Sequence, residues 1–167
     1  MTVAAQRRGV DHPASHWLTY ALGAVVVRLF GARLPDRIGP ANLIAPAMAF
    51  YVVAMMLAAR ATSFSDFLVA SLCAGIGHGY CFPVLTSQVV SRAPDAFRGS
   101  ALAFFTALWV LSELGVSPTF GAVADRHGDG AMFWLATACG ILCLALWLVL
   151  EHRLGGPTAE QSASHSP

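Results

Sequence analysis

Long apolar stretches separated by short polar segments dominate the pattern along this chain. Four stretches of more than twenty residues contain at most one charged side chain each: residues 38–59, 67–91, 99–124 and 130–150. A helix needs about 20 mostly apolar residues to cross the hydrocarbon core of a bilayer, so each stretch is long enough to span a membrane. A shorter apolar segment, 12–30, carries Arg28 near its end. It can span when it extends through Leu34, because the long arginine side chain reaches back to the interface.

This pattern predicts an all-α fold, a polytopic transmembrane bundle of about five helices. The expected helices cover residues 12–34, 40–60, 66–91, 99–124 and 130–150. A polar N-terminal segment, 1–11, precedes the bundle, and a tail, 151–167, follows it with a Ser, Ala and Pro content that predicts disorder. Arg7 and Arg8 before an apolar stretch also resemble the front of a signal peptide. Because four more spans follow, we expect residues 12–150 to form the bundle.

Composition narrows the classes of function. Apolar residues make up 56% of the chain and charged residues 11%, and the mean hydropathy is +0.62. Soluble domains carry about 25% charged residues, so composition argues against a soluble enzyme and favours the cell membrane, with the lipid bilayer as a partner. Ten arginines, no lysine and nine acids give a net charge of +1. This balance offers no basic surplus for nucleic acid.

We expect no enzyme activity, cofactor or metal. Serine and histidine occur without a motif such as Gly-x-Ser-x-Gly. Cys73, His78 and Cys81 can be read as a soft metal cluster, but zinc favours closely spaced ligand pairs on turns. Free cysteine inside apolar stretches behaves as a small hydrophobe instead.

Two segments share one pattern. Residues 32–39 read Ala-Arg-Leu-Pro-Asp-Arg-Ile-Gly and residues 121–128 read Gly-Ala-Val-Ala-Asp-Arg-His-Gly, an offset of 89 positions. The same offset places 99–124 on the first predicted helix and 130–150 on the second, whereas 67–91 falls before residue 1. The chain therefore reads as three-helix units, and the odd number of helices between copies predicts that the units are inverted in the membrane. A generic turn after a helix is the alternative.

These residues resemble the major facilitator superfamily. The signature loop of that family runs Gly-x-Leu-Ala-Asp-Arg-x-Gly followed by two basic residues. Four positions match it: Leu34, Asp36, Arg37 and Gly39. Ala32 replaces the first glycine, and Pro40 and Ala41 replace the basic pair, departures that are similar to the weaker copy in the second half of the family.

A second motif supports the same resemblance. Arg98-Gly99 before a helix, and Gly115-x-x-Pro118-x-x-Gly121 late in it, are similar to the family's eleventh helix. The resemblance covers about residues 15–150 and implies helices eight to twelve, a fragment from the C-terminal half. The N-terminal half has similar motifs and stays open as an assignment.

The resemblance implies secondary transport of an unknown small molecule by alternating access, coupled to protons and directed to efflux, with a missing N-terminal half as a partner. It also implies that residues 31–39, 92–98 and the tail face the cytoplasm. That side holds five arginines against four on the other, so the positive-inside rule is weakly satisfied. The alternative is a truncated relic, or a non-transporting membrane subunit that packs with a partner half.

Three residues are candidates for a substrate or proton pathway: Glu113, Arg28 and His78. Glu113 lies mid-span, where an ionised carboxylate costs about 2.5–3.5 kcal/mol on insertion scales, so it indicates a proton carrier or a structural hydrogen bond to a neighbouring helix. Arg28 indicates either an ion pair that holds the loop with Asp36 or an anion-binding group. His78 can titrate near neutral pH or simply form a hydrogen bond.

The loops are candidates for gating and the small residues for packing. By the resemblance, the gating motif is Leu34, Asp36, Arg37 and Gly39, with Asp36 pairing with Arg92 or Arg98, and its second copy is Gly121, Asp125, Arg126 and Gly128. Close helix packing and helix bending are expected at Gly75, Gly79, Pro83, Gly115 and Pro118.

Overall fold

The computed structural model describes residues 2–9, 15–31, 33–39 and 41–154, and every regular element in these ranges is helical. In chain order the elements are α1 (Thr2–Arg7), α2 (His16–Phe30), α3 (Leu34–Ile38), α4 (Ala41–Arg60), α5 (Phe64–Arg92), the 3-10 helix η2 (Asp95–Phe97), α6 (Arg98–His127) and α7 (Asp129–Leu154). Four apolar candidate spans are present: Ala41–Arg60, Phe64–Arg92, Asp95–His127 and Asp129–Arg153. The prediction of an all-α membrane bundle is confirmed.

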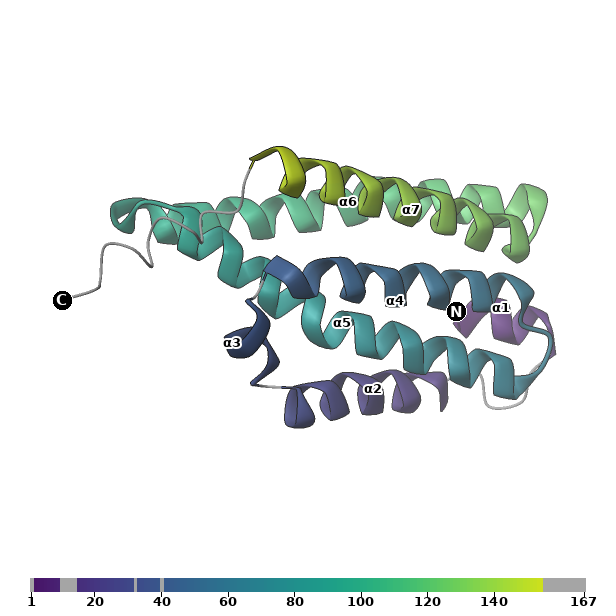
Figure 1. The fold of residues 1–167 in the computed structure, drawn as a ribbon. Coiled ribbons are helices and arrows are strands. Elements are labelled where there is room, and N and C mark those ends of the chain that lie inside the picture. Colours follow the sequence, from purple (N-terminus) through teal and green to yellow (C-terminus); the bar gives the residue numbers. More distant parts are fainter. Residues whose placement is uncertain (1, 10–14, 32, 40, 155–167) are drawn as a thin grey trace.

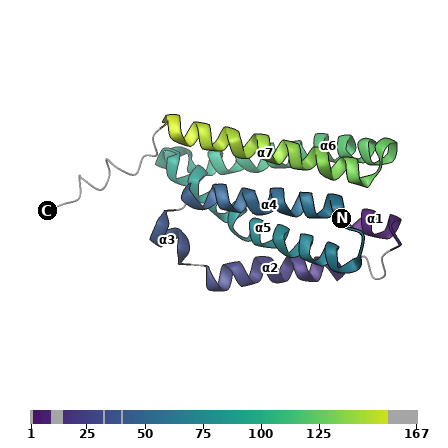
Figure 2. The same ribbon diagram turned by 45° about the vertical axis from the view of Figure 1, so that its right-hand side comes forward.

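The long helices lie side by side and alternate in direction (Figure 1). α5 packs against α2 and α4, and α4 also packs against α7. α6 lies beside α7 and contacts α5 as well, an arrangement that Figure 2 shows from a second direction.

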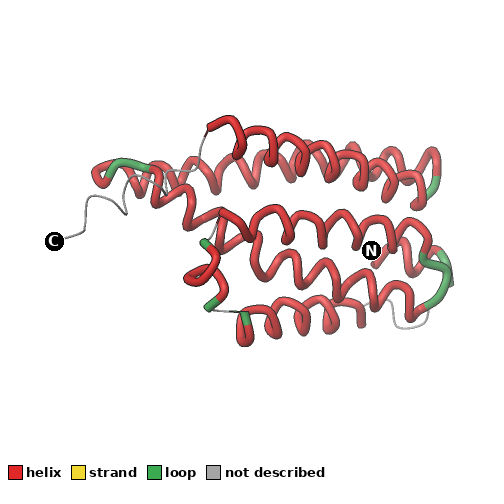
Figure 3. Tube along the Cα trace, in the orientation of Figure 1, coloured by secondary structure: helices red, strands yellow, loops and turns green. Residues whose placement is uncertain are grey.

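The alternation defines two ends of the bundle, between which the helices run (Figure 3). One end gathers α3, the α5–α6 turn and the end of α7, in residues 31–39, 92–98 and 151–154; we call it the α3 end. The other end gathers α1, the α4–α5 turn and the α6–α7 turn, in residues 2–9, 60–66 and 125–130; we call it the α1 end.

The first apolar helix is shorter than the sequence predicts. α2 ends at Phe30 instead of continuing through Leu34. Pro35 has no amide hydrogen, and its ring clashes with a helical carbonyl four residues earlier, which is that of Gly31. This carbonyl accepts hydrogen bonds from the amide of Leu34 at 3.0 Å and from the hydroxyl of Tyr80 at 3.1 Å. The chain therefore turns at this point and starts α3.

Both flanking segments contain more helix than the sequence predicts. In the polar segment 1–11, α1 buries Ala4 and Ala5, each 2% exposed. They join a cluster formed by Ala58, Ala61, Phe67, Ala70 and Phe133. At the other terminus α7 runs through Leu154, so the predicted tail starts as helix. Residues 155–167, on which the predicted disorder depends, lie outside the described residues.

A capping box sets the start of α5. The hydroxyl oxygen of Ser63 accepts a hydrogen bond from the amide of Asp66 at 3.3 Å. The Asp66 carboxylate accepts from the amides of Thr62 and Ser63, both at 2.8 Å. These bonds satisfy amides that have no partner within the helix, so they fix where the α4–α5 turn ends.

Glycines bring α5 close to both of its neighbours. A methyl group on Gly75 would overlap the carbonyl oxygen of Tyr20 in α2, and Gly79 approaches the following turn of α2. A methyl group on Gly77 would lie 2.8 Å from the carbonyl oxygen of Ala47 in α4. Small residues allow such close backbone approach between helices in a bilayer, where van der Waals packing drives association.

Candidate functional site

A row of aromatic side chains crosses the bundle from α2 to α6; we call Tyr20, Tyr51, His78, Phe82 and Trp109 the aromatic row. His78, on α5, is its centre. The Nδ1 atom of His78 lies 2.7 Å from the hydroxyl oxygen of Tyr51 on α4. The ring of Tyr20 on α2 has its centroid 5.6 Å from that of His78. Three helices thus contribute side chains around one imidazole.

The row continues toward α6 through stacked and edge-on rings. His78 stacks on Phe82, one turn later on α5, with ring centroids 6.2 Å apart. Phe82 meets Trp109 of α6 edge to face at 5.5 Å. The indole nitrogen of Trp109 then donates a hydrogen bond of 3.0 Å to the carboxylate of Glu113. Of the three pathway candidates, His78 therefore lies at the centre of the aromatic row, and Glu113 is hydrogen-bonded to its last member, Trp109.

Glu113 lies midway along α6 and is exposed in the described chain. Its hydrogen-bond donor, Trp109, is on its own helix instead of a neighbouring one. Beside it, an open groove of about 770 Å³ follows the same side of α6, where Leu102, Thr106 and Val110 are among the lining residues. Because Thr106 precedes Glu113 by two helical turns, the two share one side of the helix. Glu113 is not one of the residues that line the groove, but burial of this side of α6 by a further segment would penalise the charge of its carboxylate.

Arg28 is not a member of the row, although it lies near enough for its charge to act on Tyr20 and His78. It occupies the last turn of α2 and is exposed, and among the described side chains it forms no ion pair. The side chain of Asp36 lies outside what the structure describes, so the expected pairs of Asp36 with Arg28, Arg92 or Arg98 lie outside it too.

The two arginines expected near Asp36 have other acidic neighbours. Arg92 lies 3.7 Å from Glu151 of α7, and Arg98 lies 2.8 Å from Asp95 of η2. All four residues belong to the α3 end or to its helix termini. The Arg98–Asp95 contact lies within the α5–α6 turn, and the Arg92–Glu151 contact joins this turn to the end of α7.

The two copies of the Asp-Arg-x-Gly pattern form the same backbone turn. The amide of Gly39 donates to the carbonyl of Pro35 at 3.0 Å, and the amide of Gly128 donates to that of Ala124 at 2.9 Å. Both glycines have φ in the left-handed region, +83° and +87°. Donors and acceptors are each 89 positions apart, the offset of the sequence repeat.

The copies differ in the helix that precedes the turn. Pro35 ends α2 early, whereas Ala124 occupies the matching position and lets α6 continue to His127. In this second copy Asp125 is exposed on the α1 end and forms an ion pair, described next.

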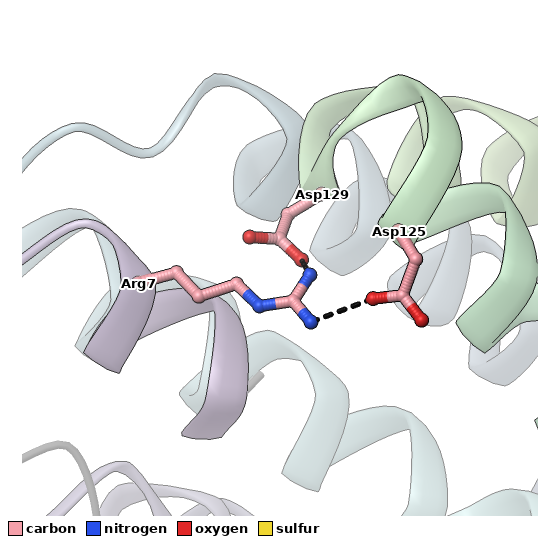
Figure 4. A network of polar contacts seen from close by, with 3 residues as sticks. All are labelled: Arg7, Asp125 and Asp129. Carbon is pink, nitrogen blue, oxygen red and sulfur yellow. Dashed lines mark hydrogen bonds and ion pairs between the residues drawn. The ribbon is translucent and has the colours of Figure 1, made fainter.

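Arg7 joins the α6–α7 turn at the α1 end, as Figure 4 shows. Its guanidinium lies 2.7 Å from the carboxylate of Asp125 and 3.4 Å from that of Asp129. The hydrogen bond to Asp125, followed by the charge of Asp129, raises the pKa of Arg7 above its already high ordinary value. Sequence reasoning missed this contact, because Asp125 and Asp129 follow Arg7 by 118 and 122 positions. No local spacing connects residues so far apart.

The remaining predicted positions are helical. α5 runs through Pro83 and α6 runs through Pro118 without interruption. A methyl group built on Gly115 or Gly121 would meet no described atom within 4 Å. Among the described residues, no three His, Cys, Asp or Glu side chains gather closely enough to hold a metal ion.

Comparison with known proteins places the chain in a family. The family model "Major Facilitator Superfamily" matches residues 2–167. An uncharacterized MFS-type transporter of Salmonella typhimurium is 29% identical over 76% of this chain and 33% of its own length. Multidrug resistance protein MdtL of Klebsiella pneumoniae is 26% identical over 93% of this chain and 40% of its own length. The chain thus spans about a third to two fifths of these two relatives.

No solved structure matches. The family match nevertheless covers nearly all of the chain, and the four apolar spans and the repeated Asp-Arg-x-Gly turn agree with it. The chain belongs to the Major Facilitator Superfamily of membrane transporters.

Proposed function

We propose that this chain takes part in proton-coupled efflux of a small molecule across the cell membrane, with Glu113 as the proton carrier. Family membership and the similarity to MdtL, a multidrug resistance protein, support transport and efflux. The single observation that carries the coupling role is a carboxylate midway along a membrane-spanning helix, hydrogen-bonded to the end of the aromatic row.

The chemistry of the carboxylate explains how coupling works. An ionised acid at the centre of a bilayer costs about 2.5–3.5 kcal/mol on insertion scales. Protonation removes this cost, so a protonated Glu113 can move through an apolar environment that its ionised form avoids. The indole N–H of Trp109 stabilises the ionised form by a charge-assisted hydrogen bond. Proton binding at Glu113 then competes with substrate binding at the neighbouring aromatic rings.

The two Asp-Arg-x-Gly turns serve gating in this proposal. Leu34, Asp36, Arg37 and Gly39 form the gating loop at the α3 end, which faces the cytoplasm. The second copy, with Asp125 and Gly128, lies at the opposite end. Their shared geometry supports inverted three-helix units, between which transporter sites form.

Flux measurements in proteoliposomes containing the 167-residue chain test this function. A lipophilic dye is expected to be expelled when a pH gradient is imposed, and Glu113→Gln is expected to abolish the gradient dependence because the amide cannot carry a proton. Trp109→Phe keeps an aromatic ring but removes the indole N–H, so flux should persist with a shifted pH profile. Glu151→Gln, which removes an acid at the α3 end, is the matched control. Gradient-driven flux that is equal in wild type and Glu113→Gln would refute the role of Glu113 in proton coupling.

A second candidate is a membrane subunit that packs with a partner half. It is favoured by α6, whose most apolar window has no residue buried in the described chain, and by the limited share of the relatives that the chain covers. In this case the 167-residue chain gives no flux alone, and flux returns when an N-terminal half is co-reconstituted. The dye assay therefore separates the two candidates.

A further inference from the structure

The α1 helix contacts two separate turns through two consecutive arginines. Arg7 is the last residue of α1 and Arg8 directly follows it, and the two side chains reach different turns. Arg7 reaches the α6–α7 turn, where it pairs with Asp125 and Asp129 (Figure 4). Arg8 reaches the end of α4 on the other side. A six-residue helix thus connects two helix pairs that are remote in sequence.

Arg8 completes the end of α4. Its guanidinium donates to the carbonyl of Ala58 at 3.3 Å and to the carbonyl of Ala61. The last carbonyls of a helix have no partner within it, and the amide of Thr62, four residues after Ala58, donates to Asp66. Arg8 therefore supplies a donor where one is missing, at the end of the helix that favours a positive charge.

Contacts with aromatic and apolar side chains also hold α1 between the same two turns. The guanidinium of Arg8 lies 5.5 Å from the centroid of the Phe67 ring at the start of α5. Ala4 and Ala5 are buried in the cluster that also holds Phe133 of α7. Elements from both sides of the α1 end therefore meet in this one short helix.

We propose that α1 is a reversible clasp that fastens the α4–α5 turn to the α6–α7 turn and restrains both turns. The contact of Arg7 with Asp125 is suited to release, because the side chain of Arg7 is 46% exposed and that of Asp125 is 66% exposed, whereas the longer contact with Asp129 involves a side chain that is 11% exposed. An exposed ion pair shifts an equilibrium by no more than about fivefold. The proposal is independent of the proposed transport function, because it concerns only how two turns of this chain are joined.

The remainder of the bundle does not depend on the clasp. α4 and α7 pack along their length, and the guanidinium of Arg60 lies 5.3 Å from the Trp134 ring centroid. Release of α1 therefore loosens two turns without separating the helices. A clasp therefore affects only the two turns that it joins, whereas an element that supports the whole fold would affect the entire bundle.

Hydrogen–deuterium exchange of the 167-residue chain in lipid nanodiscs tests the proposal. In Arg7→Gln, amides in residues 2–9, 60–66 and 125–130 are expected to exchange faster, by up to about fivefold, which is the upper limit for an exposed ion pair. Residues 31–39 and 92–98, at the opposite end, should be unchanged. Arg126→Gln is the matched control: it removes a charge at the same end, and among the described residues Arg126 has no ion pair.

A double variant tests the partners of Arg7. Asp125→Asn with Asp129→Asn should reproduce the exchange pattern of Arg7→Gln while leaving α1 and Arg8 intact. Unchanged exchange in both variants, or faster exchange confined to residues 2–9, overturns the clasp. Because exchange is measured without substrate or gradient, failed dye flux with the expected exchange pattern refutes transport alone, and the converse result refutes the clasp alone.

Discussion

Replacing Gly75 by alanine should loosen α2 from α5. The added methyl group would overlap the carbonyl oxygen of Tyr20 and lie 2.9 Å from its carbonyl carbon. Both are backbone atoms, so no side-chain rotation relieves the clash. Ordinary contact begins at 3.4 Å, and α2 must therefore withdraw by more than an ångström to clear the carbonyl oxygen.

The expected loss follows from two opposing terms. Overpacking of a tightly packed contact costs about 1–3 kcal/mol, and a clash with backbone falls at the upper end of that range. Alanine is better than glycine inside a helix by about 1 kcal/mol. The net expectation for Gly75→Ala is a loss of about 2 kcal/mol in the free energy of unfolding. Gly115→Ala keeps only the second term, because no described atom lies within 4 Å of the new methyl group.

Reversible unfolding of the purified chain by SDS in mixed micelles, followed by circular dichroism, measures both variants. The two Gly→Ala changes should shift the free energy of unfolding in opposite directions, Gly75→Ala downward and Gly115→Ala upward. A gain of similar size in both variants would refute the reasoning, because it would mean that α2 does not approach α5 at Gly75.

Three further effects are expected in the same unfolding assay. Gly128→Ala should lose about 1–3 kcal/mol, because a φ of +87° with a ψ of 160° suits glycine; an unchanged stability would contradict the turn geometry. Ser63→Ala removes the hydroxyl acceptor of the capping box and should lose about 1 kcal/mol, whereas Ser65→Ala, which removes a hydroxyl 2.9 Å from that of Ser63 but no acceptor of an amide, should lose less. Tyr80→Phe removes the hydrogen bond to Gly31 and should lose about 1 kcal/mol; no loss would show that water replaces the hydroxyl.

Local patterns in the sequence predict the spans and the repeated turns, because these depend on nearby residues. The runs of apolar residues predict the long helices, and the Asp-Arg-x-Gly pattern predicts a helix end followed by glycine, which the bonds of Gly39 and Gly128 display. The end of α2 at Phe30 agrees with the presence of Pro35, which disfavours helix in the preceding turn, but α4, α5 and α6 continue through Pro46, Pro83 and Pro118. A proline alone therefore does not tell from the sequence where a membrane helix ends.

Contacts between distant segments are beyond such reasoning. Glu113 and His78 stand out singly as polar residues in apolar stretches, but their connection depends on how Phe82 and Trp109 meet when α5 packs on α6. In the sequence, Arg7 is only one of four arginines on the side of the membrane where the positive-inside rule does not expect them. Its role depends on Asp125 being brought to it by the fold.

The early end of α2 has a consequence for the surrounding lipid. Its 15 residues rise about 22 Å at 1.5 Å per residue, against a hydrocarbon core about 30 Å thick. On this flank the hydrophobic surface is shorter than the bilayer, whereas the neighbouring α5, with 29 residues, exceeds it. Such mismatch is accommodated by local thinning of the bilayer or by interfacial side chains that reach outward. Arg28, in the last turn of α2, is placed to do so, and the protein should therefore favour thin membranes on the α2 side.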